Sequence, residues 1–298
     1  MRCRAGAVVT LVVGIASAGR AAVLGHTLRG LEHQSCRPDR ILVSTPAPRD
    51  LPAGLTEVGG VGIERLAAGP GLTRQRNAIL ESLAPGDIVA FLDDDFVPAT
   101  DFLEVAERLF SLYPDVVVAT GRVLADGIKG PGIGHAAATA LLSRAPPPEG
   151  ILADVPDAYG CNMVVRVPPP GGPRFDEALP LYGWLEDVDF SRRMASHGRV
   201  VWTDALRGVH LGVKIGRSPG VRLGYAQIAN PCYLARKGTL AWLRAARLMG
   251  GNIAANLVRS VAPEPWVDRR GRLRGNLLAM ADLARRRLAP GRILDLEP

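Results

Sequence analysis

The chain has 298 residues, of which 47% are apolar and 22% charged, so it can bury one large core or two smaller ones, and wholesale disorder is excluded. Its formal net charge is +7 and arginine carries nearly all of the positive charge, which suits anionic substrates, nucleic acid or an acidic membrane surface. The four cysteines form no C-x-x-C pair, which argues against a zinc ribbon and indicates free thiols in a reducing compartment.

The first predicted element is a buried strand at Val8–Val13, because the run is rich in β-branched valine and Gly14 closes it. The same segment imitates a secretory signal peptide, but the elements that follow need a partner strand here. Short apolar runs then alternate with helical patterns, which predicts a mostly parallel α/β sheet flanked by helices. The expected strands are 40–44, 63–66, 88–92 and 116–123, and the expected helices are 21–32, 73–83 (with Thr73 as N-cap) and 102–112.

The pattern changes in the second half of the chain. Glycine-rich and proline-rich segments at 127–134, 146–148 and 168–173 are predicted to be loops. Strands are expected at 160–167 and 200–202, a helix at 187–197, and helical, arginine-rich structure from Thr239 onward. Residues 240–261 are interrupted too often by arginine and asparagine to cross a membrane. The simplest organisation is a domain of residues 1–238 followed by a basic helical extension, residues 239–298, that packs on it or lies at a membrane surface.

Three adjacent carboxylates, Asp93, Asp94 and Asp95, follow the apolar run at 88–92. They repel one another, so a cation should compensate them, and alternate residues of an extended segment point the same way. Asp93 and Asp95 can therefore converge on one hard cation, Mg²⁺ or Mn²⁺, shared with substrate phosphates. The alternative is a solvated acidic turn in which Asp95 lies near a helix N-terminus.

Two further segments contain candidate site residues. Glu186 and Asp187 follow Trp184 at the start of a predicted helix, where an apolar neighbour can raise a carboxylate pKa towards that of a general base. The alternative is a capped helix end with charges that favour its dipole. Arg74 and Arg76 stand at an earlier helix start, suited to a nucleotide or to the three carboxylates, or else they form a solvated helical turn.

In chain order, these segments resemble the family 2 glycosyltransferases with the glycosyltransferase-A fold. The resemblance covers roughly residues 7–215, and it depends on the order and spacing of short motifs. These motifs are Leu72–Asn77, Asp93–Asp95, Tyr159–Met163, Phe175–Glu177, Trp184–Arg193 and Gly208–Gly212. The resemblance implies an inverting enzyme that moves a sugar from a nucleotide-diphosphate donor to an acceptor hydroxyl with the help of Mg²⁺ or Mn²⁺.

The resemblance also implies roles for single residues. Asp95 would bind the cation, Asp93 the donor ribose or the cation, and Asp187 would be the base, with Glu186 as the alternative. His210 lies where relatives place a histidine near the metal or diphosphate, although a lone histidine can also be structural. The donor side would include Asp94, Arg74, Arg76 and Asn77, and the sugar or acceptor side Gly160, Cys161, Asn162 and Trp184. Relatives carry an acidic residue after the second strand; here Ser44 or Thr45 substitutes, or Asp50 reaches in.

The expected partners are a nucleotide-sugar donor and a glycan or lipid-linked acceptor, as in polysaccharide biosynthesis. Residues 1–238 would then be the catalytic domain, in a cytoplasmic protein at the inner face of the cytoplasmic membrane. The arginines of residues 269–274 and 285–287 suit peripheral contact with anionic lipid. Nucleic acid is not expected, because aromatic residues are sparse, at 5%, and do not interleave with these arginines.

Two other functions fit part of the sequence. A haloacid-dehalogenase-like phosphatase would use Asp93 and Asp95 at the end of a strand. However, that fold needs a lysine near the phosphoryl group and places its nucleophile strand first in the chain, whereas here the acidic strand is the fourth predicted. A non-enzymatic, basic membrane-surface adaptor would use only the arginines of the extension.

Overall fold

A computed structural model describes residues 9–216 and 219–296. The chain divides into two compact units. The first, called here the sheet unit, contains the residues up to Pro70 together with Arg74–Phe175 and Phe190–Gly216. The second, the helical unit, contains Gly71–Thr73, Asp176–Asp189 and the chain from Arg217 on. The boundary expected after residue 238 coincides with the end of a helix, Gly220–Lys237, and stays a prediction.

A ten-stranded mixed sheet forms the centre of the sheet unit, with the strand order β3-β4-β2-β1-β5-β9-β7-β10-β6 and β8 paired to β10. Strands β4, β2, β1 and β5 are parallel to one another, as are β7 and β10, whereas β9 runs antiparallel between β5 and β7 and β3 pairs antiparallel with β4. The strands are β1 Leu11–Ala16, β2 Arg40–Thr45, β3 Glu57–Val58, β4 Val61–Ala67, β5 Ile88–Asp93, β6 Phe96–Pro98, β7 Val116–Asp126, β8 Leu152–Asp154, β9 Asn162–Arg166 and β10 Arg199–His210.

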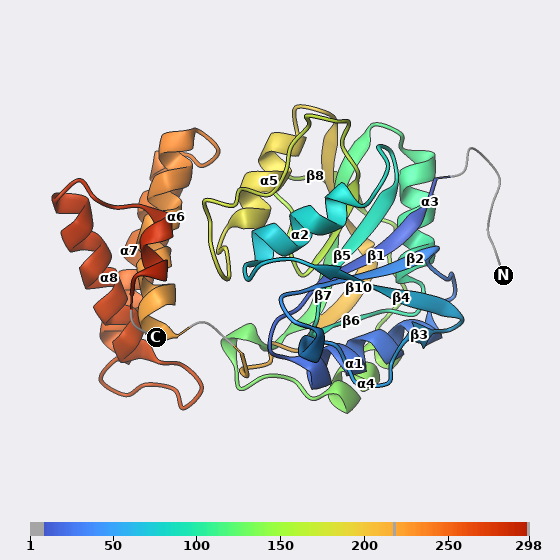
Figure 1. Ribbon diagram of the computed structural model, residues 1–298, viewed down its shortest axis with the longest axis horizontal. Coiled ribbons are helices and arrows are strands. Elements are labelled where there is room, and N and C mark those ends of the chain that lie inside the picture. Colours follow the sequence, from blue (N-terminus) through green and yellow to red (C-terminus); the bar gives the residue numbers. More distant parts are fainter. Residues whose placement is uncertain (1–8, 217–218, 297–298) are drawn as a thin grey trace. The chain divides into compact units, whose positions relative to one another are not determined.

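Helices cover both faces of this sheet (Figure 1). Alternate residues of β1 face opposite sides: Val13 lies in one apolar cluster with Leu24 and Phe102, and Val12 lies in another with Ile79 and Phe190. The described helices are α1 Ala21–Gly30, α2 Leu72–Glu81, α3 Phe102–Leu112, α4 His135–Arg144, α5 Glu186–Met194, α6 Gly220–Lys237, α7 Trp242–Arg259 and α8 Arg269–Ala284, with short 3-10 turns at Leu31–His33, Pro48–Asp50, Gly127–Lys129 and Pro290–Leu294.

The helical unit is built on α6, α7 and α8, which contact one another in pairs. Its largest apolar cluster includes Tyr225 and Ile228 of α6 and Ala279 of α8. Backbones approach closely where α6 meets α8, since a Cβ at Gly224 would lie 2.1 Å from the Arg272 carbonyl oxygen. Among the described residues, none of the helices is both long enough and apolar enough to cross a bilayer.

Several predicted elements need correction. The first strand begins at Leu11, not at Val8, which lies outside the described residues. Helix α2 already begins at Leu72, so Thr73 lies inside its first turn and its hydroxyl donates to the Leu179 carbonyl oxygen at 3.2 Å; the N-cap prediction is wrong. The strand expected at 200–202 continues to His210. Helices α4 and α6 and the short strands β3, β6 and β8 were not predicted.

Candidate metal centre

The acidic segment Asp93–Asp95 leaves the carboxyl edge of the sheet between β5 and β6. Asp93 is the last residue of β5 and lies opposite Ala16 of the parallel strand β1, at the edge where such sheets bind ligands. Strand β6 then pairs antiparallel with the end of β10, which places His210 opposite Phe96. This pairing requires a glycine at Gly208, because a Cβ there would lie 2.0 Å from the Phe96 ring. A histidine distant in sequence is thereby brought to the acidic turn.

Asp93, Asp95 and His210 form a cluster whose donor atoms all lie within 4.8 Å of one another. His210 Nε2 lies 3.4 Å from Asp95 Oδ1 and 3.8 Å from Asp93 Oδ2. Asp95 and His210 are buried, whereas the Asp93 side chain is 28% exposed, so the cluster is open to a ligand on the Asp93 side. Two carboxylates and one imidazole can together hold a divalent cation such as Mn²⁺, so the donor set fits the expected cofactor.

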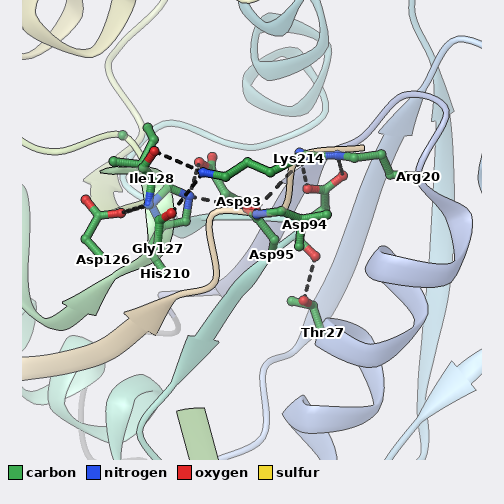
Figure 2. A network of polar contacts seen from close by, with 12 residues as sticks. Arg20, Thr27, Asp93, Asp94, Asp95, Asp126, Gly127, Ile128, His210 and Lys214 are labelled. Atoms are coloured by element: carbon green, nitrogen blue, oxygen red, sulfur yellow. Dashed lines mark hydrogen bonds and ion pairs between the residues drawn. The ribbon is translucent and has the colours of Figure 1, made fainter. Parts of the chain in front are cut away.

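Asp126 holds the other side of the His210 ring (Figure 2). His210 Nδ1 lies 3.0 Å from Asp126 Oδ1, and the Tyr159 hydroxyl donates to Asp126 Oδ2 at 3.0 Å. This contact leaves Nε2 for the cluster, as in metal sites where a carboxylate orients the ligating histidine. Burial lowers the pKa of His210, but hydrogen bonds to Asp126 and Asp95 outweigh it and raise the pKa to about 10. A cation at Nε2 would have to displace that proton.

Asp95 is fixed by the chain that follows β10. Its Oδ2 accepts a hydrogen bond from the Val213 N–H at 2.8 Å, and its backbone carbonyl accepts one from the Leu211 N–H at 2.9 Å. Burial raises the pKa of Asp95, but the hydrogen bond and charge of His210 and the charge of Arg20 reverse this effect and lower the pKa on balance. Asp95 is therefore an ionised carboxylate held in one orientation, as a metal ligand requires.

Asp94 faces away from this cluster and is fully buried. Its carboxylate accepts hydrogen bonds from Arg20, at 3.0 Å from Nε and closer from Nη2, and from the Ser17 hydroxyl at 2.6 Å. The Thr27 hydroxyl also donates to the Asp94 backbone carbonyl, at 2.6 Å. Burial raises the pKa of Asp94 to about 7, although Arg20 opposes the shift. These contacts make Asp94 an anchor of the turn, and no sequence motif indicated Arg20 as its partner.

The first residues of α2, at positions 72–77, also support the acidic turn. Arg76 is buried against the rings of Phe91 and Phe175 and donates to Asp93 Oδ1 at 3.1 Å and to the Gly160 carbonyl oxygen at 2.7 Å. The Asn77 amide forms two hydrogen bonds with the Phe175 backbone, at 2.8 and 2.9 Å. The Arg76 and Asn77 side chains thus hold neighbouring segments in place. Arg74, the other candidate residue of this helix start, is exposed.

Ser44 and the segment 160–162 are buried around the same edge. Gln75 donates to the carbonyl oxygens of Ser17 and Ser44, at 2.8 and 2.7 Å, and so ties the ends of β1 and β2 together.

The Cys161 carbonyl accepts from the Asp93 N–H at 3.2 Å, and Asn162 Oδ1 accepts from the Thr120 hydroxyl at 2.8 Å. Within the described residues, the Ser44 hydroxyl and Asn162 Nδ2 have no hydrogen-bond partner. Their predicted ligand contacts stay predictions.

Lys214 is a cation beside the cluster that the sequence motifs did not indicate. It donates from Nζ to the carbonyl oxygens of Gly127 and Ile128, at 2.9 and 3.0 Å. Figure 2 shows its side chain extending from the chain after His210 to that turn. The segment after His210 can approach the Gly127 turn only because residue 212 is glycine. Gly212 has a φ of 65°, and a Cβ there would lie 2.2 Å from the Gly127 backbone.

Glu186, Asp187 and Trp184 belong to the helical unit. Glu186 opens α5 and is buried, and Asp187 is half-buried, with Oδ1 accepting from the Val188 N–H at 2.8 Å. The Trp184 carbonyl accepts from Asn230 Nδ2 at 2.8 Å. Leu185, between them, has a φ of 73°, a strained conformation for a non-glycine residue. The roles of Glu186 and Asp187 as base stay predictions.

No protein-family model and no curated protein matches the sequence. Solved structures do match. GalNAc-T7, solved with UDP, GalNAc and Mn²⁺, has a TM-score of 0.52 at 13% identity over 93% of this chain and 57% of its own. The mannosyltransferase PcManGT of Pyrobaculum calidifontis, solved with GDP-Man and Mn²⁺, has 0.48 at 14% over 96% and 85%, and S. aureus TarS has 0.47 at 13% over 95% and 55%.

The TM-score of 0.52 with GalNAc-T7 indicates a similar fold. The predicted fold class is confirmed: the chain is an α/β protein with a glycosyltransferase-A-like, mostly parallel central sheet flanked by helices. The chain spans just over half the length of GalNAc-T7 and of TarS. At this level of identity the likeness extends to the fold and not to the activity.

Proposed function

We propose that this chain is a metal-dependent glycosyltransferase of the family 2 type that moves a sugar from a nucleotide-diphosphate donor to a hydroxyl group with inversion. The observation that carries the proposal is the cluster of Asp93, Asp95 and His210 at the carboxyl edge of the sheet. The fold of the chain is similar to that of GalNAc-T7, which was solved with UDP, GalNAc and Mn²⁺. Inversion, family 2 membership and the roles of single residues rest on the sequence resemblance.

Asp93, Asp95 and His210 would hold the cation, and Asp126 would keep the His210 ring in the ligating orientation. A bound Mg²⁺ or Mn²⁺ offsets the charge that develops on the departing diphosphate. Lys214, which is held at the Gly127 and Ile128 carbonyl oxygens next to Asp126, would add a second positive charge for that group. Arg74 and Ser44 would contact the nucleotide, while Arg76, Asn77 and Asp94 act by positioning their neighbours.

In the transfer step, the acceptor hydroxyl oxygen forms a bond to the anomeric carbon while the bond from that carbon to the diphosphate oxygen breaks. The acceptor proton passes to a carboxylate, which we assign to Asp187, with Glu186 as the alternative. Gly160, Cys161, Asn162 and Trp184 would lie on the sugar or acceptor side. Attack from the face opposite the leaving group inverts the anomeric configuration. The acceptor would be a glycan or a lipid-linked sugar, met at the cytoplasmic face of a membrane.

The test uses a panel of nucleoside diphosphates and nucleotide sugars with and without Mn²⁺. A donor that binds the folded chain should raise its melting temperature only when the cation is present. Asp95→Ala should abolish this shift, whereas Asp187→Asn should keep it and lower the rate of transfer by about 10²–10⁴-fold. Asp154→Ala, an exposed carboxylate paired with Arg199, is the matched control and should change neither.

Three results would contradict the proposal. Donor binding that needs no metal and survives Asp95→Ala would contradict the assigned metal centre. Near-normal transfer by Asp187→Asn would contradict the assigned base. Hydrolysis of a simple phosphate ester, without any dependence on a nucleotide sugar, would instead favour a phosphatase.

A further inference from the structure

The outer side of helix α7 carries exposed apolar side chains near both of its ends, with Arg247 and small residues between them. Leu243, Leu257 and Val258 of α7 and Val261 just beyond it are between 57% and 83% exposed. The opposite side of the helix packs into the unit through Ala245 and Asn256, which are buried. Leu243, Gly250, Ala254 and Leu257 lie on one stripe of a helix about 27 Å long, and Val261 follows the helix end. We call this stripe the α7 outer face.

Aromatic residues stand at both ends of the α7 outer face. Trp242, the first residue of α7, is 55% exposed, and Trp266 lies exposed in the loop between α7 and α8. Tryptophan favours the boundary between lipid and water, where its ring is apolar and its N–H remains hydrated. An exposed apolar stripe of this length on a water-facing surface marks an interaction site.

The charges around the stripe have one sign. Residues 239–298 contain eleven arginines and five acidic residues, and no acidic residue lies between Thr239 and Pro263. The acidic residues nearby are occupied: Glu264 pairs with Arg259 and Arg269, Asp268 caps α8, and Asp282 is buried with Tyr225 and Arg292. Arg247 on α7 and Arg270 and Arg274 on α8 are exposed. The surface therefore offers positive charge beside apolar side chains.

We propose that the α7 outer face docks on the surface of an anionic lipid bilayer, with the helix lying in the plane of the interface. Apolar side chains would enter the boundary between headgroups and acyl chains, and the arginines would contact lipid phosphates. A second copy of the chain fits less well, because a two-fold contact would set the arginines of one copy against those of the other with no carboxylate between them. This inference holds whether or not the chain transfers a sugar.

Sedimentation of the full chain with vesicles tests the proposal. The chain should bind phosphatidylcholine vesicles that contain phosphatidylglycerol, should bind pure phosphatidylcholine much more weakly, and should be released by salt. Leu243→Glu combined with Leu257→Glu should weaken binding by about tenfold or more, since two leucines that would enter the bilayer become charged. Leu112→Glu, at an equally exposed leucine that ends α3, is the matched control and should bind like the unaltered chain.

A second variant separates charge from folding. Arg247→Gln with Arg274→Gln leaves the apolar stripe intact and should remove most of the preference for anionic vesicles. Equal binding to neutral and anionic vesicles, or binding unaffected by the Leu243→Glu and Leu257→Glu pair, would overturn the proposal. So would a dimer in solution that this pair dissociates while vesicle binding is absent, because the stripe would then be a contact between copies of the chain.

Discussion

The carboxyl edge of the sheet and the α7 outer face use charged side chains in opposite ways. At the sheet edge, three charged side chains are buried and held by fixed partners: Asp94 by Arg20, Asp95 by Val213 and His210 by Asp126. On the α7 outer face, Arg247 and the leucines around it project into solvent. The first arrangement fixes geometry at an energetic cost, which suits a metal centre. The second leaves side chains adaptable, which suits a fluid lipid surface.

The largest expected difference between the two regions concerns stability. Arg20→Ala leaves the Asp94 carboxylate buried without its counter-charge, so the free energy of unfolding should fall by about 3–5 kcal/mol. Arg247→Ala on the α7 outer face should change it by less than about 0.5 kcal/mol. Urea denaturation followed by circular dichroism measures both.

Arg40 provides the control within the sheet unit, because its pair with Glu64 is exposed. Arg40→Ala should cost about 1 kcal/mol or less. If Arg20→Ala and Arg40→Ala cost the same, burial of Asp94 does not distinguish the acidic turn from an ordinary surface pair, and the contrast between the two regions is lost.

The next effect concerns the cation. Asp126→Asn removes the charge that orients His210, so the affinity for Mn²⁺ should fall by about 10–100-fold while the fold is retained. Calorimetric titration with Mn²⁺ measures it. Asp115→Asn, an exposed carboxylate near Arg199, should leave the affinity unchanged. An unaltered affinity in Asp126→Asn would mean that His210 is held by Tyr159 or by packing and that Asp126 has no part in the metal centre.

The sequence predicted those parts of the site that lie within one local segment. Strand β5 and the carboxylates after it were recognised because an apolar run ends abruptly in Asp93–Asp95. Asp126 and Arg20 were missed, since both reach the site through pairings between distant strands and loops. His210 was identified only through the resemblance, because the length of β10, which brings it to Phe96, depends on its partners β6, β7 and β8.

Residue propensities and periodicity also failed to predict elements whose position depends on tertiary packing. Helix α6 was not predicted because it contains Pro231, and because Gly220 and Gly224 weaken its intrinsic helical propensity. The structure needs these glycines, since α6 packs against α8 with little room between the backbones. The first strand was placed at Val8–Val13 by its β-branched residues, whereas its true position follows from pairing with β2 and β5. Tertiary contacts decide both cases.

Two glycine substitutions sharpen the comparison further, because the same change should have opposite signs in the two regions. Gly208→Ala would place a Cβ 2.0 Å from the buried Phe96 ring, so the β6–β10 pairing must shift and stability should fall by about 1–3 kcal/mol. Gly250→Ala on α7 meets nothing within 4 Å and should raise stability by about 0.5–1 kcal/mol, since alanine is the better helix former. Thermal unfolding of both variants measures the two shifts. A loss in Gly250→Ala would mean that α7 is covered on that side in solution, whereas a gain keeps the face open for a bilayer.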